Sequence, residues 1–152
     1  MITRRRALGL TVAAVAAAPV RASATETDTG PLTVIAAYHR AVIGAYGALI
    51  AKAHATQRAT LKRLRLRAAN AAAALPKPPS TTPVATDATI DQLIQIEEAL
   101  IASCYTALQN VADERHLKGI AAFMADAGRR VVVLRDLGGK PLLPRAFETG
   151  GA

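Results

Sequence analysis

The chain has 152 residues, of which 19 are Lys or Arg and 11 are Asp or Glu, so its formal net charge is +8. That length and a 51% hydrophobic content suffice for one domain with a packed core, and the single cysteine, Cys104, excludes an internal disulfide. The first 24 residues hold four arginines and no acid, so the other 128 carry 15 basic and 11 acidic residues.

Residues 1–24 have the three parts of an export signal peptide. An arginine cluster precedes the apolar run 7–18, which is shorter than the roughly 20 residues that span a bilayer core. Pro19 ends that run, and the small side chains of Ala22 and Ala24 match a signal-peptidase site, so we predict cleavage there. The alternative is a basic amphipathic helix retained at a membrane surface or on a cytoplasmic protein.

The segment around Arg4 and Arg5 resembles the twin-arginine export motif, with Leu8 in the apolar pair and Ala7 where a bulky residue is usual. The predicted partners are therefore the twin-arginine export machinery and signal peptidase. No cysteine directly follows the apolar run, which predicts no lipid anchor. We expect the mature protein in the periplasm, in the cell envelope or secreted.

Residues 25–152 are predicted to form one all-α domain, because alanine dominates and no segment alternates with a period of two. Apolar residues recur at helical spacing in four segments: 31–53, 56–75, 89–111, and one from Asp113 to the glycines at 138 and 139. Asp113 is expected to cap the last helix, and its neighbour His116 to face water. A tail with little regular structure is expected from about residue 138. Cys104, on an apolar helix, is expected to be buried.

The connection between the second and third predicted helices is rich in proline. Residues 76–88 contain four prolines, which favour an extended path of roughly 40 Å, longer than a helix of about 20 residues. Such a crossover predicts two antiparallel hairpins joined in a ferritin-like four-helix bundle. The alternative is a flexible linker between two independent hairpins, neither of which has enough core alone.

Several stretches resemble an uncharacterised family of bacterial ferritin-like domains: "AAYHRAVIGAYGALIAK", the basic second helix, the proline-rich crossover, "LIQIEEALIASCYTAL" and "LRDLGG". The resemblance covers about residues 32–139. It implies the ferritin-like fold and leaves the biochemical role open. Di-iron members of the superfamily bring a Glu from each of two helices and a Glu-x-x-His from each of the other two.

This chain lacks that complete set, because its first two predicted helices contain no acid. The candidate metal ligands that the helices can direct inward are His39, Glu97, Glu98 and Asp126. We expect no cofactor, with an iron or manganese site as the alternative. On the structural interpretation, Glu98 pairs inside the bundle with His39, or with Arg129 or Arg130.

Positive charge gathers in the first half of the mature chain. Residues 29–86 hold eight basic residues and no acid, whereas residues 87–152 hold nine acids and seven bases. The basic residues of the second predicted helix form a possible polyanion-binding face: Arg58, Lys62, Arg63, Arg65 and Arg67. An anionic envelope polymer, a lipid surface or an acidic protein fits this face, and Leu66 is a candidate exposed contact.

Nucleic acid is not expected, because the protein is predicted to be exported and no aromatic residues interleave the basic ones. The alternative is a solvated face that keeps an alanine-rich protein soluble. The sequence does not decide whether the chain forms a homodimer. No nucleophile elbow or phosphate loop indicates an enzyme. We therefore expect a binding, envelope-associated or structural role, with a metal-dependent redox protein as the alternative.

Overall fold

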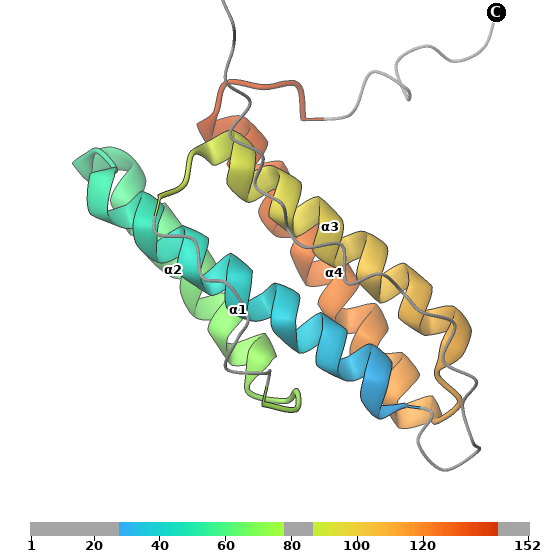
Figure 1. Ribbon diagram of the computed structural model, residues 1–152. Helices are drawn as coiled ribbons and strands as arrows, with labels where there is room; N and C mark the ends of the chain where they lie inside the picture. The colour runs from blue at the N-terminus through green and yellow to red at the C-terminus, as the bar shows by residue number, and fades with distance from the viewer. Residues whose placement is uncertain (1–27, 78–86, 143–152) are drawn as a thin grey trace, which may run out of the picture.

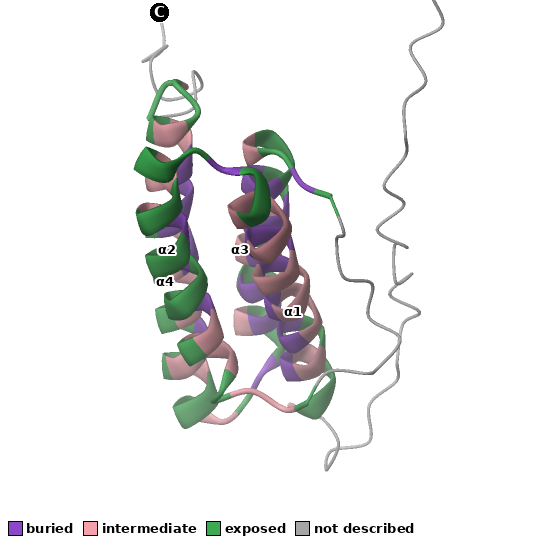
Figure 2. Cartoon of the chain, turned by 90° about the vertical axis from the view of Figure 1, so that its left-hand side faces the viewer, coloured by how far each residue is buried: buried purple, intermediate pink, exposed green. Residues whose placement is uncertain are grey.

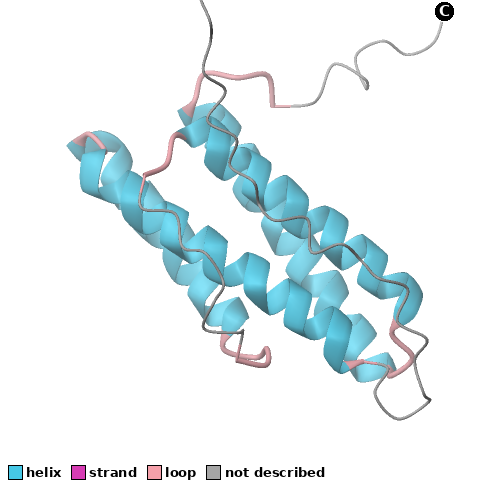
Figure 3. Cartoon of the chain, viewed as in Figure 1, coloured by secondary structure: helices cyan, strands magenta, loops and turns pink. Residues whose placement is uncertain are grey.

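The computed structural model describes residues 28–77 and 87–142, which contain four α-helices and no strand (Figure 1). The helices are α1 (Thr29–Lys52), α2 (Ala55–Ala72), α3 (Ile90–Asn110) and α4 (Glu114–Leu137), joined by short loops within each hairpin (Figure 3). The all-α prediction is confirmed for this part of the chain. The predicted signal peptide, residues 1–24, lies outside the described residues.

Local side-chain chemistry determines where the second pair of helices begins and ends. The Thr89 hydroxyl accepts a hydrogen bond from the Gln92 amide, and the Gln92 side chain accepts one from the Thr89 amide, which is a capping box. The Asp113 carboxylate accepts the Arg115 amide at 2.8 Å, so the predicted cap of α4 is confirmed. Beyond α4, Gly139 has a φ of 63°, a conformation that favours glycine.

Contacts at the helix ends show in which direction each helix runs relative to the others. Lys52, the last residue of α1, pairs with Asp87 just before α3, and Asp28 at the other end accepts the amide of Ala112 just after α3. α1 and α3 are therefore antiparallel, as are the partners within each hairpin (Figure 1). Since α2 and α3 both begin where α1 ends, they run parallel. Most of the predicted proline-rich crossover lies outside the described residues.

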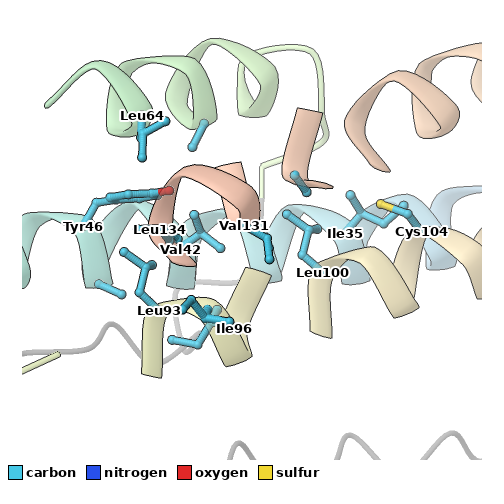
Figure 4. Close-up of a cluster of buried hydrophobic side chains, with 14 of the residues drawn as sticks. Ile35, Val42, Tyr46, Leu64, Leu93, Ile96, Leu100, Cys104, Val131 and Leu134 are labelled. Atoms are coloured by element: carbon cyan, nitrogen blue, oxygen red, sulfur yellow. The ribbon is translucent and has the colours of Figure 1, made fainter. Parts of the chain in front are cut away.

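Buried side chains line the inner sides of the helices, and Figure 2 shows most of the outer side of α2 exposed. α2 buries three residues, whereas α1 and α3 bury seven each, so α2 is the most peripheral helix. Figure 4 shows the centre of the core, where side chains of all four helices meet. Cys104 is fully buried there, as expected.

One described helix is long and apolar enough to resemble a membrane span or a signal sequence. It is α1, near the N-terminus, with a mean hydropathy of 1.4 over its most apolar window. The core helix of a soluble protein passes the same test, and α1 packs against α2 and α3 with Ile35, Val42 and Tyr46 fully buried. α1 is therefore a core helix of the bundle, and export remains a prediction from residues 1–24.

Candidate functional sites

The two adjacent acids of α3 face opposite environments. The Glu97 side chain is fully buried, whereas that of Glu98 is 44% exposed. Successive helical residues are about 100° apart, so only one of the two can point into the core. Glu98 Oε1 instead lies 2.7 Å from Nη2 of Arg135 at the surface of α4.

The pairing expected for Glu98, with His39 or with Arg129 or Arg130, is therefore wrong. Glu97 takes the inward position, because it follows the spacing of the buried residues Leu93 and Leu100 on the same side of α3. That register was visible in the sequence.

Arg130 of α4 is the partner of Glu97. Its Nε donates to Oε1 at 2.7 Å and its Nη2 donates to Oε2 at 2.8 Å, and both side chains are fully buried. Two parallel bonds between a guanidinium and a carboxylate are stronger and more directional than a single ion contact. Burial raises the pKa of the Glu97 carboxyl, and its bond to Arg130 opposes that rise.

Three further side chains complete the centre. The Tyr46 hydroxyl of α1 donates to Glu97 Oε1 at 3.1 Å, and Arg130 also pairs with Asp126 one turn earlier on α4. The second Asp126 oxygen lies 3.9 Å from Nε of Arg67 on α2. The centre thus receives a side chain from every helix and links the two hairpins through their charges.

His39 of α1 is fully buried, and neither of its ring nitrogens makes a hydrogen bond of normal geometry to a described residue, although the Ala68 backbone lies close enough to raise the pKa of the ring slightly. Burial, followed by the positive charge of Arg130, lowers the pKa of His39 from 6.5 to about 4. Its ring stands edge-on to Phe123, with 5.5 Å between the ring centroids. His39 is therefore neutral at physiological pH.

These residues do not fit a di-iron pair. The buried centre offers two carboxylates, Glu97 and Asp126, and one imidazole, whereas a di-iron site uses four carboxylates and two histidines. Arg130 pairs with both carboxylates, so its fixed positive charge opposes a divalent cation at the same oxygens. The ion pairs and hydrogen bonds of this centre join the helices and orient the side chains.

A second group of polar residues joins the start of α1 to the loop between α3 and α4. Asp28 accepts the amides of Ala112 at 3.1 Å and Asp113 at 3.2 Å, and its carboxylate lies 3.0 Å from Nδ1 of His116. Ligand atoms of Asp28, Asp113 and His116 lie within 4.8 Å of one another. Asp113 also binds Arg115, and the His116 side chain is 44% exposed, so this group is a surface clasp between two helix ends.

All five basic residues predicted to form the polyanion-binding face are exposed on α2. Lys62 and Arg65 have no ion-pair partner within residues 28–77 and 87–142, and Arg63 reaches only the Thr60 hydroxyl, at 3.4 Å. Neither α1 nor α2 contains an acid that could offset this charge. The face is therefore strongly cationic.

A groove of about 510 Å³ runs between α2 and α4, the neighbouring helices with the fewest mutual contacts. Leu66, at its edge, is 61% exposed, as the sequence suggested for this residue. The lining residues are Thr60, Arg63, Leu64, Leu66 and Arg67 of α2, and Val133 of α4.

No protein-family model matches the chain, and searches of curated proteins and of solved structures found no match.

Proposed function

We propose that this protein is an exported ferritin-like helical bundle whose cationic α2 face holds it on an anionic component of the cell envelope. The observation that carries the proposal is the exposure of five basic side chains on a helix that, together with its neighbour α1, contains no acid. A surface that serves only solubility usually intersperses charges of both signs. A face that carries only positive charge instead attracts polyanions and anionic head groups.

The fold and the location belong to the same proposal. Two antiparallel hairpins with α2 parallel to α3 support a ferritin-like arrangement. The arginine cluster, the short apolar run and the small residues near Ala24 support export through the twin-arginine pathway. The buried pair of Glu97 and Arg130 serves to join α3 to α4 within one hairpin, and Tyr46 and Arg67 connect this centre to the other hairpin.

The test measures binding of the mature chain to vesicles of phosphatidylglycerol, with phosphatidylcholine vesicles for comparison. Each basic residue near an anionic surface contributes about 1 kcal/mol, so the double variant Lys62→Gln/Arg65→Gln is expected to bind about 30-fold more weakly. Added salt is expected to weaken the wild-type binding. The matched control is Lys118→Gln/Arg129→Gln, which removes the same charge from exposed positions on α4. Equal binding of the two double variants overturns the proposal.

A metal-binding protein is the second candidate, favoured by one observation. Neither nitrogen of the buried His39 makes a hydrogen bond of normal geometry to a described residue, and the Ala68 backbone and the Asp126 carboxylate both act on the ring electrostatically. Metal analysis of protein purified from its exported compartment tests this candidate. Stoichiometric iron or manganese that is lost in His39→Leu would favour it over the structural role of the centre.

A further inference from the structure

The groove between α2 and α4 combines an apolar floor with a cationic edge. Leu64 and Val133 lie along it, and the more exposed Leu66 continues the apolar surface outward. Arg63 and Arg67 are four residues apart and so lie on the same side of α2. Both arginines line the same opening as the apolar side chains.

Within residues 28–77 and 87–142, few groups neutralise this edge. Among those residues Arg63 binds only the Thr60 hydroxyl, and Arg67 is 57% exposed and 3.9 Å from Asp126. Asp126 is itself paired with Arg130, so its charge is shared. A guanidinium with free N–H groups matches a carboxylate in a bidentate geometry.

We infer that this groove binds a fatty carboxylate in monomeric form, with the acyl chain on Leu64, Leu66 and Val133 and the carboxylate on Arg63 and Arg67. The volume of about 510 Å³ lies in the range of small-ligand sites. The inference rests on the proposed function in that α2 is the binding helix. It adds a specific ligand class and uses side chains other than Lys62 and Arg65.

Other occupants fit less well. A second copy of the chain would bring its own cationic α2 to a surface that is already cationic. A stable protein partner buries about 800 Å² on each side, whereas the large apolar side chains exposed along α2 and α4 are Leu66 and Val132. A short groove lined by a few apolar residues and two arginines suits one chain with one anionic head.

The test is a titration of the mature protein with dodecanoate below its micellar concentration, followed by the NMR shifts of the Leu64, Leu66 and Val133 methyl groups. Saturable shifts confined to the groove are expected. Leu66→Gln and Arg63→Gln are each expected to weaken binding about tenfold, through lost apolar contact and lost charge-assisted bonds. Both side chains are exposed, so neither change disturbs the core.

Matched control variants distinguish binding in the groove from non-specific binding of the amphiphile. Val34→Gln on α1 and Lys118→Gln on α4 remove an apolar side chain and a positive charge at exposed positions away from the groove, and are expected to leave dodecanoate binding unchanged. Dodecyltrimethylammonium, with the same chain and a positive head, is expected not to bind. Equal affinity of the two amphiphiles, or of groove and control variants, overturns the inference.

Three further outcomes distinguish this inference from its premise and from dimerisation. Saturable dodecanoate binding without vesicle binding overturns the proposed function alone, and vesicle binding lost in Lys62→Gln/Arg65→Gln without dodecanoate binding overturns the groove alone. A dimer that weakens in Leu66→Gln while dodecanoate causes no shifts assigns the groove to a second copy and overturns the inference.

Discussion

Arg130 and Glu97 join α4 to α3 through two hydrogen bonds of 2.7 and 2.8 Å inside the core, and neither side chain reaches solvent. Removing two ions from water costs several kcal/mol each, and the attraction between them offsets that cost only while both are present. The stability of the bundle therefore depends on the pair as a unit.

Single replacements in this pair are expected to destabilise the fold strongly. Arg130→Met leaves Glu97 as an unpaired buried charge and should lower the free energy of unfolding by about 3–5 kcal/mol. Glu97→Leu should cost less, because Arg130 keeps its ion pair with Asp126. The double variant Glu97→Leu/Arg130→Met removes both charges and should recover most of that loss. Urea denaturation of the four proteins measures the coupling, and additive losses would contradict the ion-pair description.

Tyr46→Phe tests the third member of the centre. The change removes the hydroxyl that donates to Glu97 Oε1 and should lower the free energy of unfolding by about 1 kcal/mol. Burial raises the pKa of Tyr46, so the hydroxyl remains a donor at neutral pH. In a Glu97→Leu background the same change should have a much smaller effect, and an undiminished effect would show that Tyr46 acts through packing alone.

His39 should make stability depend on pH in the mildly acidic range. Its pKa is about 4 in the folded protein and 6.5 in an unfolded chain, so between these values the unfolded state binds a proton that the folded state does not. The free energy of unfolding should therefore fall by about 3 kcal/mol as the pH drops from 6.5 to 4. Above pH 6.5 this contribution is constant.

The variant His39→Leu isolates that effect. The other ionisable residues are the same in both proteins, so the difference between the two stability curves reports on the imidazole. The wild-type curve should fall relative to the variant between pH 6.5 and 4, as followed by urea denaturation. Parallel curves over that range would show that His39 is accessible to protons in the folded bundle.

The clasp at Asp28 gives a separate prediction at one end of the bundle. The bond to His116, followed by the amide of Ala112, lowers the pKa of Asp28 below 3.8. His116→Ala should move that pKa back toward its ordinary value, measured by NMR titration of the carboxylate. Asp28→Ala should also speed hydrogen exchange at the amides of Ala112 and Asp113, while exchange at the Gln92 amide, at the other end of α3, stays unchanged.

Cys104 should report on global unfolding. It is fully buried, and burial raises the pKa of its thiol to about 11, so the folded protein holds little of the reactive thiolate at neutral pH. A thiol reagent should modify it only as fast as the bundle opens, and urea should accelerate that reaction. Rapid labelling of the folded protein at neutral pH would contradict this burial.

The positions of the helices could be predicted from the sequence, because helix caps and apolar periodicity are local sequence features. Capping by Asp113, the terminating glycine pair and the apolar register of Leu61 and Leu64 predict spans close to those observed. The cationic face was equally visible, since the charge of α2 needs only a count of its residues. The ferritin-like family and export remain predictions.

It was harder to predict which of the two adjacent acids on α3 points into the core, because the answer depends on the helical register of α3 and on the residue that faces it from α4. Glu97 and Glu98 are chemically identical neighbours, and a rotation of about 100° decides which is buried. The partners on α4 supply this information: the buried cation Arg130 faces Glu97, while Arg135, five residues later, lies near the surface beside Glu98. Helical periodicity could have pointed to Glu97, but pairing it with Arg130 required the packing of α3 on α4.

The sequence by itself determined an all-α chain, the positions of its helices and the one-sign charge of α2, because propensity, capping and composition act within a single segment. Only the tertiary structure decided that Glu97 meets Arg130, that Asp28 closes onto the loop before α4, and that α2 and α4 leave a groove beside Leu66. Those relationships join residues from different helices, so they depend on how the helices are aligned and how closely they approach one another.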